Sequence, residues 1–166
     1  MKTITTLFLP VFFVLGAFTI APEEEEKELK RPGNIGDSGI DDYVNQCFDN
    51  YEGVIATDKN LATIEKDLEK IEKDGNKIKS DADILKRLYA IQGEIRKRDD
   101  NIKGLDSRAA GVLQSAKDLK PVTKAPKATK NVNTATKALK ISQEKSPAQA
   151  KKTQDLILRA EAMVEK

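Results

Sequence analysis

Apolar side chains recur every three or four residues along most of the chain, which is the spacing of one face of an α-helix. The first such stripe predicts a helix over about residues 41–73, with Ser38, three residues before Asp41, as its cap. Residues 74–76 should end it, because glycine and asparagine tolerate the left-handed backbone of a helix exit. The stripe consists of Val44, Cys47, Tyr51, Val54, Ile55, Leu61, Ile64, Leu68 and Ile71.

A second apolar stripe predicts a helix that begins after Ser80 and ends near Lys120, just before Pro121. Its positions form two interleaved sevenfold series, which is the spacing of a coiled-coil seam. Arg98 occupies one of these positions and interrupts the seam. We therefore expect residues 41–120 to form a long helical hairpin. The seam residues that we expect to mediate association are Leu88, Ile91, Ile95, Ile102 and Leu105.

The last segment, residues 121–166, is expected to fold back on this hairpin. Apolar steps of three and four residues predict a weakly amphipathic helix over about residues 127–145. Ser146 and Pro147 then have the pattern of a helix cap followed by a proline in the first turn, so a separate final helix should follow them. The sequence thus predicts an all-α fold, an elongated antiparallel three- or four-helix bundle made of a coiled-coil-like hairpin and a proline-broken third arm.

Residues 1–21 have the pattern of a signal peptide, because Lys2 precedes an apolar run that ends at the small residue Ala21. We expect cleavage there and secretion of the remaining chain to the extracellular side. Pro22 hinders cleavage, so the alternative is an uncleaved signal anchor that tethers the protein to the membrane. Residues 22–40 are acidic and then rich in proline and glycine, which predicts a disordered leader.

The composition after the signal favours long helices with narrow seams over a broad globular core. A third of all residues are charged, at 34%, so little apolar surface remains for burial. The core must therefore be thin and mostly aliphatic. The aromatic residues that follow the signal are Tyr43, Phe48, Tyr51 and Tyr89.

The single cysteine, Cys47, excludes a disulfide within one chain. In an oxidising compartment, an odd cysteine either forms an intermolecular disulfide or stays as a buried thiol. Cys47 shares the apolar stripe of the first predicted helix, where a thiol packs well. Both interpretations stay open at this point.

Catalytic chemistry finds little support in the sequence. The segment 36–39 reads Gly-Asp-Ser-Gly, as around the nucleophile of chymotrypsin-like proteases, but the chain has no histidine to act as the general base. No acidic or cysteine spacing typical of a metal site is present, and no glycine-rich phosphate loop. We therefore expect no enzyme activity, no metal and no cofactor.

Charge divides the chain into two parts of opposite sign. Residues 22–120 contain 18 basic and 23 acidic residues, a net charge of −5, whereas residues 121–166 contain 10 basic and 4 acidic residues, a net charge of +6. A basic arm of this kind attracts polyanions. The candidate polyanion-binding residues are Lys124, Lys127, Lys130, Lys137 and Lys140.

These features predict an exported, non-enzymatic structural or interaction protein. Its expected partner is an acidic protein or a second copy of the chain, with an anionic glycan or lipid surface as a further option. Nucleic acid is a poor candidate because it is scarce outside cells. The basic arm could equally dock on the acidic hairpin of its own or a neighbouring chain. The alternative function is an extracellular carrier of a lipid or another apolar ligand, with the interruptions at Gly93 and Arg98 easing the opening of the bundle.

Overall fold

Three long helices make up most of the part of the chain that the structure describes. The computed structural model describes residues 28–75, 77–78 and 82–164. The elements are α1 (Ser38–Lys73), α2 (Asp83–Lys117), a short 3-10 turn η1 (Val122–Lys124) and α3 (Ala125–Ala162). The predicted all-α helical bundle is confirmed.

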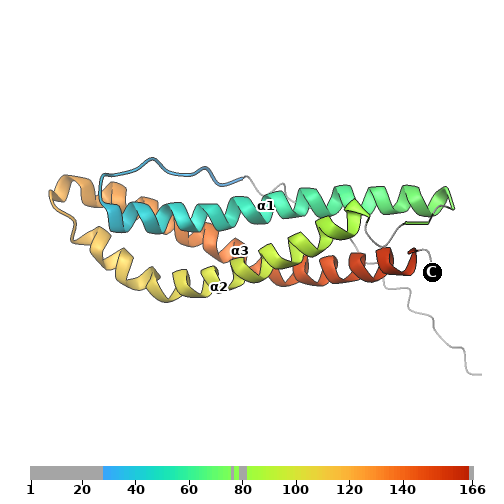
Figure 1. Cartoon of the computed structure of the whole chain (residues 1–166). Helices are drawn as coiled ribbons and strands as arrows, with labels where there is room; N and C mark the ends of the chain where they lie inside the picture. Colours follow the sequence, from blue (N-terminus) through green and yellow to red (C-terminus); the bar gives the residue numbers. More distant parts are fainter. Residues whose placement is uncertain (1–27, 76, 79–81, 165–166) are drawn as a thin grey trace, which may run out of the picture.

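The helices lie side by side along one long axis (Figure 1). α1 and α3 run in the same direction, and α2, which lies between them in the sequence, runs in the opposite direction. α3 packs against both other helices, and α1 and α2 contact each other less extensively than either contacts α3. At one end, the Ile78 amide donates a hydrogen bond to the Met163 carbonyl, which ties the connection between α1 and α2 to the end of α3.

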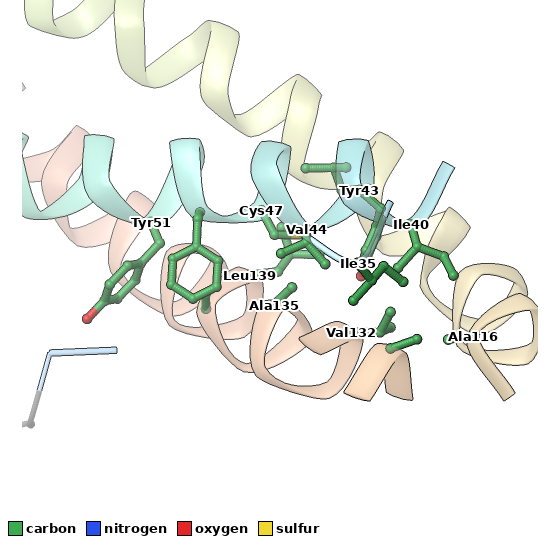
Figure 2. Packing of buried hydrophobic residues seen from close by; sticks show 14 of the residues in the cluster. Ile35, Ile40, Tyr43, Val44, Cys47, Tyr51, Ala116, Val132, Ala135 and Leu139 are labelled. Carbon is green, nitrogen blue, oxygen red and sulfur yellow. The ribbon is translucent and has the colours of Figure 1, made fainter. Parts of the chain in front are cut away.

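Two apolar clusters fill the bundle, one toward each end. The first cluster lies where α1 and α3 begin and α2 ends, and it includes Tyr43, Phe48 and Leu139. Figure 2 shows Val44 and Cys47 of α1 beside Leu139 of α3 in this cluster. The second cluster lies toward the other end. Its largest fully buried members are Leu61, Ile64, Leu68, Leu88 and Ile95.

The break predicted at Ser146 and Pro147 is wrong, because α3 continues through both residues. A proline inside a helix removes one backbone hydrogen bond, that to the carbonyl four residues earlier. Pro147 lies on the exposed side of α3, where water can bond to that carbonyl. Ser146 does not start a helix; its buried hydroxyl donates a hydrogen bond to the Asp99 carboxylate of α2.

The start of α1 also differs from the prediction. The cap is Asp37 and not Ser38, since the Asp37 carboxylate accepts a hydrogen bond from the Ile40 amide at 3.0 Å. The Asp41 carboxylate is buried against the residues before the helix, where it accepts hydrogen bonds from the amides of Ile35 and Gly36, each at 2.9 Å. The predicted exit from this helix is confirmed, with Gly75 at a φ of 65°.

A disordered leader is wrong for the described residues 28–40, because residues 28–37 form an extended strap on α1 and α3 and the next residues belong to α1. The Leu29 amide donates to the Tyr51 hydroxyl at 3.1 Å, and Asn131 of α3 donates to the Gly33 carbonyl at 2.9 Å. Ile35 is buried in the first cluster. These contacts compensate for the entropy of ordering a proline- and glycine-rich segment. The predicted signal and the first part of the leader lie outside the described residues.

The charged end of the strap is fixed by Arg31. Its guanidinium donates to both oxygens of Glu52, at 3.1 and 2.8 Å, and to Asp49 at 2.6 Å. These hydrogen bonds to carboxylates raise the pKa of Arg31. The guanidinium also lies 5.9 Å from the centre of the Phe48 ring, within the range of a cation–π contact.

Substitution of two leucines of α3, one buried and one exposed, tests which side of this helix faces the core. Leu139 is fully buried and Leu158 is 56% exposed. We expect Leu139→Ala to lower the free energy of unfolding by about 2–5 kcal/mol, because it leaves a cavity between α1 and α3. Leu158→Ala, the matched control, should change it by less than about 0.5 kcal/mol. Urea unfolding followed by circular dichroism measures both, and equal losses would contradict the packing described here.

Candidate functional site

A layer of polar side chains crosses the bundle between the two apolar clusters. Arg98 of α2 stands at its centre and is only 8% exposed. Its Nη1 donates to the Gln149 side-chain oxygen of α3 at 3.1 Å, and its Nη2 donates to the Thr57 hydroxyl of α1 at 2.9 Å. One guanidinium therefore joins all three helices.

Gln149 of α3 links this layer to α1 by further hydrogen bonds. Its Nε2 donates to the Val54 carbonyl at 2.7 Å and to the Asp58 carboxylate at 2.6 Å. Within the described residues, no fully buried side-chain nitrogen or oxygen lacks a hydrogen-bond partner. The layer is thus internally satisfied, which is the condition under which buried polar groups are tolerated.

Arg98 is buried as a charge whose direct partners are neutral. Burial lowers the pKa of Arg98, while the nearby carboxylates of Glu94, Asp99 and Asp58 act in the opposite direction. The ion pairs found among the described residues do not include Arg98. An arginine keeps its charge even so, because its pKa is far above neutrality.

Gly53 of α1 allows the Arg98 guanidinium to lie close to the backbone of α1. A Cβ atom at position 53 would lie 3.2 Å from Arg98 Nε and 3.3 Å from Nη2. That is too close for an ordinary contact, so a larger residue would displace the guanidinium. The absence of a side chain at Gly53 therefore provides the space that Arg98 fills.

A cleft of about 510 Å³ opens beside this layer, between α1 and α2. Asn50 and Gly53 contribute from α1, and Glu94, Lys97 and Asn101 contribute from α2, with Arg98 beside Gly53. The lining carries charges of both signs. The sequence does not predict this cleft, because its pattern presents Arg98 only as an interruption of the seam. The available signal was a basic residue at a position that the heptad pattern assigns to the core.

Ion pairs fix α1 against α3 in the half of the bundle that holds the second cluster. Their acidic members are spaced by seven residues on α1 and their basic members by seven residues on α3, so the parallel helices meet in register. Hydrogen bonding to Arg159 lowers the pKa of Glu72, and hydrogen bonding to Glu72 raises that of Arg159. The pairs are Asp58 with Lys145, Glu65 with Lys152 and Glu72 with Arg159.

The five residues of the predicted association seam are all buried inside this single chain. Ile102 and Leu105 belong to the first cluster, and Leu88, Ile91 and Ile95 belong to the second. α1 and α3 supply most of the other members of both clusters, so the seam holds the bundle together. Association of two chains through these residues would require the helices to separate.

Cys47 has no exposed surface. It lies in the first cluster, and burial raises the pKa of its thiol to about 11. The structure therefore has the buried thiol that the sequence left as one of two alternatives. A disulfide to a second chain through Cys47 would require the core to open.

The predicted polyanion-binding lysines are all exposed, but they do not form one uniform surface. Lys124 and Lys127 turn toward the strap, where their ammonium groups donate to the carbonyls of Ile35 and Asn34 at 3.2 and 3.5 Å. The remaining three lie along the outer side of α3, and no ion pair with another described residue is found for them. We refer to Lys130, Lys137 and Lys140 as the lysine face.

The described residues contain neither a candidate metal site nor a candidate membrane span. No group of three or more residues suited to hold a metal ion occurs in residues 28–75, 77–78 and 82–164. Within the same ranges, none of the helices has the length and apolar character needed to span a bilayer. Comparison of the chain with protein families, curated proteins and solved structures found no match.

The polar layer can be tested through Thr57. Thr57→Val keeps the shape of the side chain but removes the oxygen that accepts from Arg98, so we expect a loss of about 1–3 kcal/mol in the free energy of unfolding. Thr63→Val on the same helix is the matched control, because the exposed Thr63 hydroxyl donates only to the Lys59 carbonyl of its own helix. Chemical denaturation should show little change for the control. An equal effect of both substitutions would show that the Arg98 contact contributes nothing to stability.

The reactivity of Cys47 tests whether the first apolar cluster is packed as described. A raised pKa favours the protonated thiol, so at pH 8 the thiolate fraction falls from about a quarter for an ordinary cysteine to about a thousandth. Burial adds a steric barrier. We expect Ellman's reagent to leave the native chain unmodified at pH 8 and to react at once in denaturant, as read by absorbance. Rapid reaction of the native chain would place Cys47 outside the core.

Proposed function

We propose that this chain is an exported, non-enzymatic interaction protein that binds an acidic partner through the lysine face of α3. The observation that carries the proposal is the separation of α3 into two parts. Its carboxyl-terminal half pairs Lys145, Lys152 and Arg159 with acids of α1. Lys130, Lys137 and Lys140, in contrast, point to solvent, and none of them forms an ion pair with another described residue.

The geometry of the helix supports this surface. Lys130 and Lys137 are two turns apart on one side of α3, and Lys140 follows within a turn. Ala135, Ala138 and Leu139, on the inner side, are fully buried. The lysines are therefore held on a rigid helix in a row, a pattern that suits an extended polyanion better than a single compact anion.

The predicted seam and the cleft offer less support for an association surface. The residues of the apolar seam are buried within the bundle. The cleft of about 510 Å³ is lined by charged and amide side chains, which do not suit a lipid tail. This cleft therefore gives no support to the carrier alternative.

The lysine face can be tested by neutralising it. Each lysine near an anionic surface contributes on the order of 1 kcal/mol at moderate salt, so a triple variant with Lys130→Gln, Lys137→Gln and Lys140→Gln should lose on the order of a hundredfold in affinity. Heparin serves as the polyanion probe. We expect the variant to elute from a heparin column at clearly lower salt, with a weaker dependence of affinity on salt concentration.

The matched control removes three exposed lysines from α1, with Lys66→Gln, Lys70→Gln and Lys73→Gln. It changes the net charge by the same amount, but these lysines alternate with acidic residues on the surface of α1. The control should therefore elute close to the unmodified chain. Equal behaviour of the two triple variants would reduce the binding to net charge and overturn the proposed face.

A further inference from the structure

The cleft between α1 and α2 has the size and the lining of a small-molecule site. Its volume of about 510 Å³ lies within the range of ligand pockets, which is roughly 300–1,000 Å³. Polar groups reach it from both walls, with Gln46 and Asn50 on α1 and Asn101 on α2. These amides can both donate and accept hydrogen bonds.

Arg98 has one donor, Nε, that is not used by the hydrogen bonds of the polar layer. Its two Nη atoms bond to the neutral acceptors Thr57 and Gln149, but no described residue accepts a hydrogen bond from its Nε. Since every fully buried side-chain nitrogen in the described chain has a partner, Nε is not fully buried. Arg98 packs against Gly53, and both residues line the cleft, so a ligand oxygen inside the cleft can approach Nε.

The charge of the lining narrows the class of ligand. Arg98 and Lys97 are positive, while Asp49 and Glu94 are negative. Asp49 already pairs with Arg31 of the strap at 2.6 Å, whereas Glu94 takes part in none of the ion pairs found among the described residues. A simple anion would meet the Glu94 carboxylate, and a simple cation would meet the two basic groups. A molecule that carries both charges satisfies the two ends at once.

We propose that this cleft binds a small zwitterion of the free amino acid type. The carboxylate accepts a hydrogen bond from Arg98 Nε, and the ammonium group lies at the Glu94 carboxylate. A bound carboxylate also supplies the direct counter-charge that the buried guanidinium lacks, which is the physical reason for the binding to be favourable. The site is separate from the lysine face and does not depend on it.

The experiment follows the Nε–H resonance of Arg98 by NMR in the full-length, ¹⁵N-labelled chain. The probe is a mixture of the twenty common amino acids at about 1 mM each, a concentration that half-fills a millimolar site. We expect a saturable shift of this resonance and of the Gly53 amide. The same mixture in amine-acetylated form, and again in carboxamide form, should leave both resonances in place.

Two outcomes overturn the proposal directly. No shift with the free amino acids excludes the site, and an equal shift with the acetylated mixture shows a site for anions alone. Because replacing Arg98 endangers the fold, the variant is Glu94→Gln, a change of an exposed residue. It should weaken binding about tenfold, while Glu69→Gln, an exposed glutamate of α1 that does not line the cleft, should not weaken it. Unchanged binding by Glu94→Gln would overturn the placement of the ammonium group.

Discussion

The buried guanidinium of Arg98 sets the constraint on which the arrangement of the three helices depends. Removing such a charge from water costs several kcal/mol unless hydrogen bonds compensate it. Its partners, Thr57 and Gln149, come from the two other helices. A slip of α3 by one turn, about 5.4 Å, would take Gln149 away from both Arg98 and Asp58. Apolar clusters tolerate such slips far better, so the polar layer selects the axial position at which the clusters on either side form.

The continuity of α3 then determines which of its basic residues pair with acids of α1 and which do not. Because α3 crosses the layer without a break, one helix faces α1 along two stretches of different character. Beyond the layer, acids of α1 meet bases of α3 every seven residues, and these charges neutralise one another. Before the layer, small buried residues such as Ala128 and Ala135 bring the helices together, and the strap covers one side. The basic residues of that stretch can then only face the strap or the solvent.

Sequence periodicity was enough to predict the helical parts of α1 and α2 and the all-α bundle, because apolar stripes at helical spacing must be buried against one another. Local rules gave wrong predictions at two places. Pro147 has the pattern of a helix start, but its exposed side of α3 tolerates the lost hydrogen bond. The strap has a disordered composition, but Arg31 and Ile35 find partners that are distant in sequence. The candidate cleft could not be predicted, since it depends on how far α1 and α2 separate. The matching sevenfold spacings of Asp58, Glu65 and Glu72 with Lys145, Lys152 and Arg159 were a readable signal for the pairing of α1 with α3.

The same polar layer bears on whether the bundle can open. Parting α2 from its neighbours would separate Arg98 from Thr57 and Gln149 and expose both apolar clusters at once. Residues that looked like weak points along α2 have different effects. Gly93 has open space around it and contributes little to packing, whereas Arg98 joins the helices. The packed bundle thus keeps its apolar clusters closed. The bundle is therefore a rigid frame that carries a row of lysines on α3 and a polar cleft whose arginine is held in place by the other two helices.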